Sequence, residues 1–148
     1  MRPRFYDTIL GEMYSVTKRI DFCYGHRLLD YDGICKHPHG HNASAEIEVR
    51  TGTLDNRNMV CDFSDIKRVV KGWIDRELDH KMLLRHDDPL VAPLRQLGEP
   101  VYLLDSNPTV ERIARLIFDY AKEQGFPVVR VKVWETPTSF AEYGPAES

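Results

Sequence analysis

The chain has 148 residues, of which 42% are hydrophobic and 29% are charged, and its formal net charge at pH 7 is −3. This length suits one compact domain, and the composition is typical of globular proteins and excludes a largely disordered chain. The small net charge gives no reason to expect a nucleic-acid partner, and no apolar run approaches the length needed to cross a membrane.

The N-terminal segment shows no export signal. Residues 1–12 contain basic residues but lack a hydrophobic signal core, and they are interpreted as an extension of one domain that covers residues 1–148. The three cysteines are an odd and sparse set, unlike a disulfide framework. The sequence therefore predicts a cytoplasmic protein with reduced cysteines.

Strand-forming residues dominate the first third of the chain. Residues 13–24 are rich in β-formers and alternate loosely, which predicts a first strand. Residues 43–50 alternate small or apolar with polar side chains and predict a second strand. Turn-forming residues at 52–58 favour a hairpin between this second strand and residues 59–61.

Two amphipathic helices are predicted further along. Apolar residues recur at intervals of three and four over residues 66–78, with Asp62 or Ser64 as the expected N-cap. The second helix is expected to begin with Asn107 as N-cap and Pro108 at the first helical position. Each helix has one apolar face that must be buried against another element.

The last part of the chain returns to strand patterns. Residues 128–134 predict a strand with Val129, Val131 and Val133 on one side, and residues 138–143 suit its hairpin partner. The order of elements predicts an α+β fold in which an antiparallel four-stranded sheet carries both helices on one face. The open edges of such a sheet favour a homo-oligomer.

A histidine-rich segment indicates a metal site. The seven residues from Cys35 to His41 contain three of the six histidines. In an extended backbone residues two apart point to the same side, so His39 and His41 can hold one ion together. His26, at the end of the first predicted strand, is the nearest source of a third imidazole. Three histidines and an open fourth position are typical of a catalytic zinc site.

A structural zinc ion is the alternative interpretation. In that case Cys35 would close the site as a fourth ligand, and the spacing does not exclude it. An isolated His-x-His pair is often only a surface feature. His37 precedes a proline and has the wrong parity for a strand, so we expect it outside the set of ligands.

The cysteines differ in what they can do. Cys35 lies four residues before His39, where a nearby dication and Lys36 would favour its thiolate and make it a base or nucleophile. Cys23 and Cys61 are interpreted as packing residues.

Three further sites on the chain carry acid–base or hydrogen-bonding groups. Asp79 and His80 close the first predicted helix, either as helix-end charges or as an aspartate-oriented histidine that moves protons. Glu135 follows an apolar strand, where a buried carboxylate could accept two parallel N–H bonds from an amidine-like ring edge. Thr109 lies at a helix N-terminus, where capping alone explains it.

Five segments of the chain occur in an order that is specific in combination. They are FCYGHRL (22–28), CKHPHGHN (35–42), LDHKML (78–83), NPTVE (107–111) and WETPTSFAEY (134–143). Together they resemble a known family, the 6-pyruvoyltetrahydropterin and 6-carboxytetrahydropterin synthases, from about residue 14 to residue 143. The resemblance implies the tunnelling fold (T-fold), in which subunits join their sheets into a barrel. It also implies active sites at subunit interfaces and trimers that pair as hexamers.

The resemblance implies a role for each matching residue. It implies Zn²⁺ as the cofactor, with His26, His39 and His41 as its ligands. Cys35 matches the catalytic cysteine that moves protons on the substrate side chain. The remaining matches are the proton-relay pair Asp79 and His80, the glutamate that anchors the pterin ring, Glu135, and a residue of the segment that lines the pterin pocket, Thr109.

The family has two branches, which both act on 7,8-dihydroneopterin triphosphate. One eliminates triphosphate to give 6-pyruvoyltetrahydropterin, and the other also loses acetaldehyde to give 6-carboxy-5,6,7,8-tetrahydropterin for queuosine (7-deazaguanine) biosynthesis. The short gap between Cys35 and His39 and the Glu-Thr-x-Thr run at 135–138 resemble the second branch, a carbon–carbon and carbon–oxygen lyase. Tyr24 and Gly25 depart from the family pattern, since they replace the small pair usually seen before the first zinc histidine.

Overall fold

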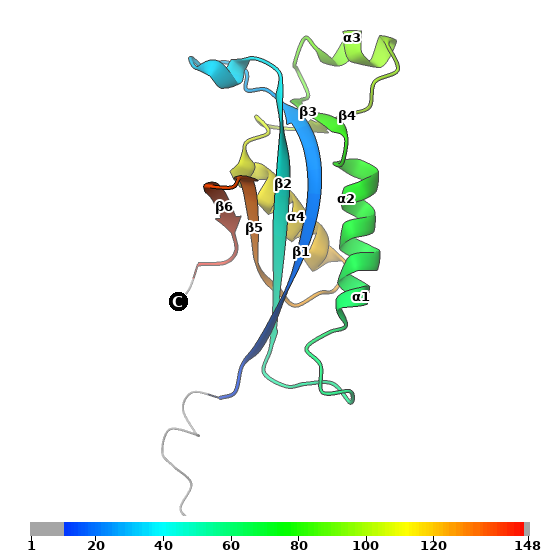
Figure 1. Ribbon diagram of the computed structural model, residues 1–148, viewed down its shortest axis with the longest axis vertical. Helices are drawn as coiled ribbons and strands as arrows, with labels where there is room; N and C mark the ends of the chain where they lie inside the picture. The colour runs from blue at the N-terminus through cyan, green and yellow to red at the C-terminus, as the bar shows by residue number, and fades with distance from the viewer. Residues whose placement is uncertain (1–10, 147–148) are drawn as a thin grey trace, which may run out of the picture.

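A six-stranded sheet forms the frame of the computed structural model, which describes residues 11–146 (Figure 1). Most of the predicted N-terminal extension, residues 1–12, lies outside the described residues. The strand order across the sheet is β4-β3-β1-β2-β5-β6. The strands are β1 (Tyr14–His26), β2 (His39–Thr51), β3 (Lys81–Arg85), β4 (Val101–Leu104), β5 (Val128–Thr136) and β6 (Ser139–Tyr143).

The predicted antiparallel sheet is present as β1, β2, β5 and β6, and two short strands extend it. β3 runs parallel to the end of β1, and β4 runs parallel to β3, so the sheet has six strands and is mixed. Neither β3 nor β4 is among the four strands predicted from the sequence. They are only five and four residues long, and short apolar runs give no clear period.

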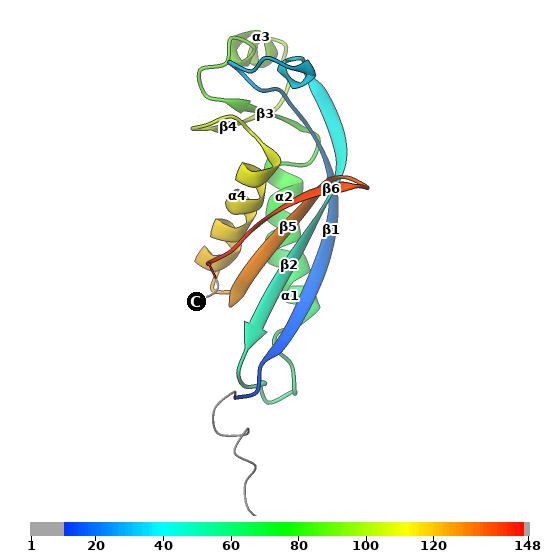
Figure 2. The same cartoon turned by 90° about the vertical axis from the view of Figure 1, so that its left-hand side faces the viewer.

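The two predicted helices lie on one face of the sheet, as expected (Figure 2). The first predicted helix is continuous over α1, the π-helical segment η2 and α2, and the Asp62 carboxylate accepts the N–H of Ser64 as its N-cap. Among the described residues, no helix is long and apolar enough to cross a membrane. The helical segments are η1 (Ile34–Lys36), α1 (Phe63–Ile66), η2 (Lys67–Lys71), α2 (Gly72–Glu77), α3 (Val91–Gln96) and α4 (Val110–Glu123).

The predicted start of the second helix is wrong by two residues. The N-cap of α4 is Thr109, whose hydroxyl accepts the N–H of Arg112, and not Asn107. The Asn107 side chain instead accepts the N–H of Leu29 at 2.9 Å and donates to the carbonyl of Leu29 at 2.8 Å. Asn107 therefore ties the loop after β1 to the segment that leads into α4.

The predicted hairpin between the second strand and residues 59–61 is also wrong. Both edges of β2 are occupied, by β1 on one side and β5 on the other, so no position is left for a further strand. The Asp55 carboxylate accepts the N–H groups of Arg57 and Met59 at 2.8 and 3.0 Å. The segment therefore closes on itself as a loop before α1.

The hydrophobic core lies between the sheet and the helices. Alternate residues of the long strands point inward, and Trp73 of α2 stacks on Tyr120 of α4 with ring centroids 4.4 Å apart. These inward rows are Ile20, Phe22, Tyr24 and His26 on β1, Ala43, Ala45, Ile47 and Val49 on β2, and Val128, Val131 and Val133 on β5.

Val129 departs from the predicted alternation. Arg130 pairs with Glu48 and Val128 pairs with Val49, so Val129 is an extra residue between two paired positions. Such a bulge shifts the side-chain alternation by one residue. Val128 therefore takes the buried position that the sequence pattern assigned to Val129.

Candidate active site

The two histidine segments meet through the pairing of β1 with β2. In this register His26 lies opposite His39, and Tyr24 lies opposite His41. His26 continues the inward row of β1, and His39 and His41 continue that of β2, because side chains two apart share a face. The strand alternation that builds the core therefore also places three imidazoles together at one end of it.

The three ring nitrogens converge on one point. The Nε2 atom of His26 lies 3.0 Å from Nε2 of His39 and 3.2 Å from Nε2 of His41. One candidate ligand atom from each ring lies within 4.8 Å of the other two. This spacing suits three ligands of a single ion, and it matches the set predicted from the sequence.

The outer ring nitrogens fix the tautomers of two of these histidines. Nδ1 of His26 lies 2.7 Å from the carbonyl oxygen of Pro108, and Nδ1 of His39 lies 2.7 Å from that of His37. A carbonyl only accepts, so both Nδ1 atoms carry the proton and both Nε2 atoms present lone pairs in the neutral rings. Lone pairs that face each other at 3.0 Å are stabilised by a cation between them, and such outer hydrogen bonds are usual for metal-bound histidines.

Burial keeps these rings in the form that binds metal. The His26 side chain is only 4% exposed and that of His41 17%. Burial lowers the pKa of both imidazoles below the ordinary value. Neutral imidazoles are metal ligands, whereas protonated ones are not, so the site favours the ligand form at neutral pH.

Cys35 lies outside the converging group. It sits in the single turn η1, and its carbonyl accepts the N–H of Leu28 at 2.9 Å. Among the described residues, the ligand group around His26 contains only the three histidines. Cys35 therefore does not close this group as a fourth ligand within one chain, which argues against the structural-zinc interpretation. The exposed side chain of His37 also lies outside the group, as expected, although its carbonyl orients His39.

Glu135 reaches the same site from β5. Its Oε1 atom lies 3.4 Å from Nε2 of His26 and 3.3 Å from Nε2 of His41. The Tyr24 hydroxyl donates to the same oxygen at 3.2 Å. Burial first, and then the charge of Glu135, raise the pKa of Tyr24, which keeps the phenol protonated as a donor. Tyr24 was not predicted as a site residue, and its departure from the family pattern is the only signal of it in the sequence.

Thr109 lies beside the histidine site, at the N-terminus of α4. Its side chain caps α4, as the capping interpretation predicted. The preceding residue, Pro108, supplies the carbonyl that holds His26. The start of α4 is therefore fixed against the end of β1 beside the three imidazoles.

Asp79 and His80 lie elsewhere in the chain. Asp79 Oδ1 accepts the N–H of Cys23 at 2.9 Å, and Asp79 Oδ2 lies 2.8 Å from Nδ1 of His80. Burial opposes the ionisation of Asp79, but these two hydrogen bonds outweigh it and hold the pKa of the carboxyl below its ordinary value. This contact corresponds to the aspartate-oriented histidine, which was one of the two interpretations of the sequence.

This pair and the histidine cluster do not share a cavity. Asp79 and His80 line a hollow of about 620 Å³ together with outward positions of β1 and β2 such as Cys23 and Ser44. Outward positions alternate with the inward rows that lead to His26. Within one chain the structure therefore keeps the relay pair apart from the three imidazoles.

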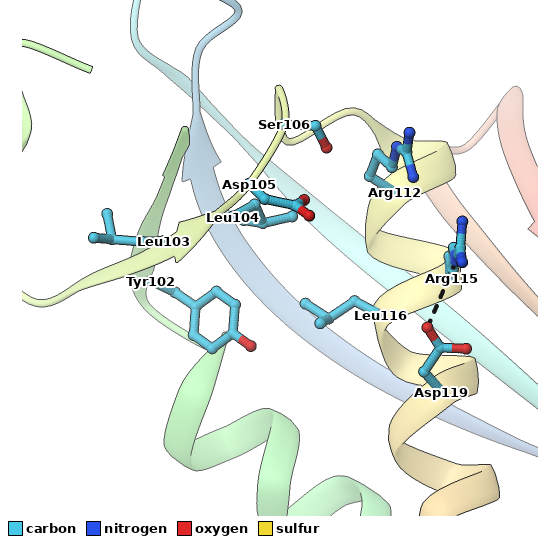
Figure 3. Close-up of a pocket in the computed structure, with 9 residues that line it drawn as sticks. All are labelled: Tyr102, Leu103, Leu104, Asp105, Ser106, Arg112, Arg115, Leu116 and Asp119. Atoms are coloured by element: carbon cyan, nitrogen blue, oxygen red, sulfur yellow. Dashed lines mark ion pairs between the residues drawn. The ribbon is translucent and has the colours of Figure 1, made fainter. Parts of the chain in front are cut away.

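A further hollow of about 380 Å³ lies between β4 and α4 (Figure 3). Arg115 and Asp119 of α4 form an ion pair at 3.6 Å beside it, and the hydroxyl of Ser106 is buried there without a hydrogen-bond partner. None of the residues predicted for the active site lines this hollow. It is therefore not the candidate active site.

Comparison with known proteins identifies the family. Residues 15–146 match the family model described as 6-pyruvoyl tetrahydropterin synthase. The 6-carboxy-5,6,7,8-tetrahydropterin synthase of Rickettsia bellii is 35% identical over 137 residues, which cover 88% of this chain and 99% of that protein. The protein of the same name from Haemophilus influenzae is 32% identical over 140 residues, with the same two shares.

Solved structures have the same fold. The crystal structure of an uncharacterized protein from Wolinella succinogenes is 26% identical, has a TM-score of 0.76, and is matched over 92% of this chain and 100% of that chain. Caenorhabditis elegans 6-pyruvoyl tetrahydropterin synthase, at 20% identity, has a TM-score of 0.69 over 92% of this chain and 98% of that chain. The predicted T-fold is confirmed, and the chain belongs to the 6-pyruvoyl tetrahydropterin synthase family.

Proposed function

We propose that this protein is a zinc-dependent 6-carboxy-5,6,7,8-tetrahydropterin synthase that converts 7,8-dihydroneopterin triphosphate with loss of acetaldehyde and triphosphate. The observation that carries the proposal is the convergence of three imidazole Nε2 atoms on one point. Relatives that carry this name at 32–35% identity support the choice of branch. We also propose that the protein is cytoplasmic and that two trimers of the chain assemble into a hexamer.

The residues around the three imidazoles suit a catalytic metal. A zinc ion held by His26, His39 and His41 would supply Lewis-acid chemistry at the hydroxyls of the substrate side chain. Pro108 and His37 hold two of the rings through their carbonyl oxygens, which orients Nε2 toward the site.

Cys35 and the pair Asp79 and His80 supply the proton transfers in this proposal. Cys35 as a thiolate removes a proton from the substrate side chain. Asp79 holds Nδ1 of His80, so that Nε2 of the exposed ring can give or take a proton. Because the pair lies outside the histidine site of its own chain, we propose that it serves the site of a neighbouring subunit.

Glu135 positions the pterin ring in this proposal. Its Oε1 atom accepts the Tyr24 hydroxyl, and its carboxylate can accept N–H groups from the 2-amino group and N3 of the ring. Thr109 would line the pterin pocket from the adjacent start of α4. Glu135 and Thr109 would thus orient the pterin ring, so that the reacting carbon of the substrate lies near Cys35.

Replacing Glu135 with glutamine is expected to raise KM for the pterin substrate by about 10–100-fold, with a smaller change in kcat. The amide keeps an acceptor for Tyr24 but loses the charge, and a hydrogen bond to a charged group contributes about 1.5–3 kcal/mol. Steady-state kinetics would measure the changes in KM and kcat separately. The matched control is Glu142→Gln on β6, and an unchanged KM in Glu135→Gln would show that Glu135 does not hold the ring.

Mass spectrometry of the products tests the proposed function directly. Zinc-loaded protein incubated with 7,8-dihydroneopterin triphosphate should yield 6-carboxy-5,6,7,8-tetrahydropterin and acetaldehyde. Formation of 6-pyruvoyltetrahydropterin would assign the chain to the other branch. Unchanged substrate, with zinc occupancy confirmed, would contradict the proposal and favour a non-catalytic module with a structural zinc ion.

A further inference from the structure

A second group of metal-ligating side chains lies away from the three imidazoles. Cys23 of β1 and the adjacent Asp79 and His80 each offer one ligand atom, and these atoms lie within 4.8 Å of one another. They line the hollow of about 620 Å³ described above, which shares no residue with the histidine cluster. Cys23 was expected only to pack, and no part of the proposed reaction uses it.

The backbone holds these three residues together before any ion arrives. The N–H of His80 donates to the carbonyl of Cys23 at 2.8 Å, and the N–H of Cys23 donates to Asp79 Oδ1 at 2.9 Å. His80 adopts a φ of 58°, in the left-handed region that non-glycine residues seldom occupy. Two hydrogen bonds thus fix one strand residue against the pair, and a ligand set that is already in place loses little entropy on binding.

The chemistry of the three groups selects a thiophilic divalent ion. Thiolate, carboxylate and imidazole are all zinc ligands, and a sulfur ligand disfavours Mg²⁺ and Ca²⁺. Within one chain the His80 side chain is 78% exposed, so the ring can adjust to an ion. The cation that lines the hollow, Arg19, is paired with Asp21 at 3.2 Å. Three protein ligands leave a fourth position for water.

We propose that Cys23, Asp79 and His80 form a second binding site for zinc or another thiophilic divalent ion. On binding, Cys23 releases its thiol proton to solvent, and the proton on Nδ1 of neutral His80 moves to Nε2, so that Nδ1, which lies 2.8 Å from Asp79 Oδ2, can bind the ion and one proton leaves per ion. With Nδ1 on the ion and the proton on Nε2, the ring can no longer take up a proton at Nε2. Excess zinc therefore inhibits the enzyme, a consequence that rests on the proposed function, whereas the binding of the ion does not.

Titration with Cd²⁺ tests the site without measuring activity. Protein that already carries one zinc ion per chain should take up one cadmium ion per chain, with the ultraviolet charge-transfer absorption of a cadmium thiolate. Cys23→Ser should lose both the second ion and the absorption and retain the zinc. His80→Ala should weaken cadmium binding at least tenfold. This result would support the site even if the Cys23→Ser substitution itself disturbed the structure.

Two cysteine variants serve as matched controls for this titration. Cys61→Ser and Cys35→Ser should both keep the second ion and its absorption, because neither thiol belongs to the group. Wild-type protein that takes up no second ion would overturn the proposal. Thiolate absorption that persists in Cys23→Ser and vanishes in either control would overturn it as well.

The inhibitory consequence has a separate readout. Excess zinc should lower the turnover of the wild-type protein several-fold, whereas Cys23→Ser should keep its own rate measured at one zinc per chain. Uptake of the second ion without loss of turnover would overturn the inhibitory role. Absence of turnover in wild-type protein at one zinc per chain would contradict the proposed function, and the cadmium titration would still decide the site.

Discussion

Replacing Cys35 with alanine is expected to lower kcat by about 10²–10⁴-fold, the usual contribution of a positioned general acid or base, while one zinc ion per chain stays bound. The zinc stays because the converging ligand atoms belong to three histidines and Cys35 is outside their group. The carbonyl of Cys35 keeps its hydrogen bond from Leu28 in the variant, so the turn η1 is preserved. Turnover and metal content should be measured on the same preparation.

The matched control for this variant is Cys61→Ala. Cys61 lies in the loop before α1 and packs against the hydrophobic core. It is far in sequence from every proposed catalytic residue. Its replacement should leave kcat unchanged within about twofold. Loss of zinc from Cys35→Ala would make Cys35 a ligand and support the structural-zinc interpretation. Retained turnover would assign the proton abstraction to another group.

Replacing His39 with alanine is expected to weaken zinc binding by more than about 100-fold and to abolish turnover at equimolar zinc. Loss of only an outer partner of a metal ligand already costs 10–100-fold in affinity, and this change removes a ligand itself. His39 is preferable to the buried His26, whose loss would also leave the Pro108 carbonyl without its partner. Equilibrium competition with a chelating dye would measure the affinity.

The fold of the His39→Ala variant should persist. The hydrophobic core lies between the long strands and the helices and does not include His39. We therefore expect the core to form without the metal. A bound ion adds about 2.7 kcal/mol at a hundred times its dissociation constant, which thermal melts with and without chelator would show. His37→Ala keeps the carbonyl that orients His39 and is the control. Unfolding of His39→Ala or of chelated wild-type protein would favour the structural-zinc module.

Local patterns in the sequence were sufficient to predict much of the frame and the metal cluster. The alternation in β1 and β2 and the three- and four-residue period of the first helix depend on neighbouring residues, and the structure confirms them. The same alternation placed His39 and His41 on one side. The third ligand, His26, could be named because it ends a predicted strand, and strand pairing brings it opposite His39.

Contacts between distant residues were beyond these patterns. Cys23 meets Asp79 across 56 positions of sequence, and no period in either segment signals that contact. Tyr24 and Glu135 are 111 positions apart and meet only because β1 and β5 both flank β2. The N-cap was misplaced because Asn107 has a stronger partner in Leu29 than in the helix.

The three histidines continue the rows of inward-pointing core residues on β1 and β2. This arrangement limits which changes the sequence can accept during evolution. Single substitutions along β1 or β2 leave the alternation intact, so hydrophobic residues can be exchanged while His26 still points inward. An insertion or deletion of one residue between Phe22 and His26 would turn the imidazole to the opposite face of the sheet. Evolution of this chain can therefore vary the residues of these strands widely but must preserve the number of residues between the core and the ligands.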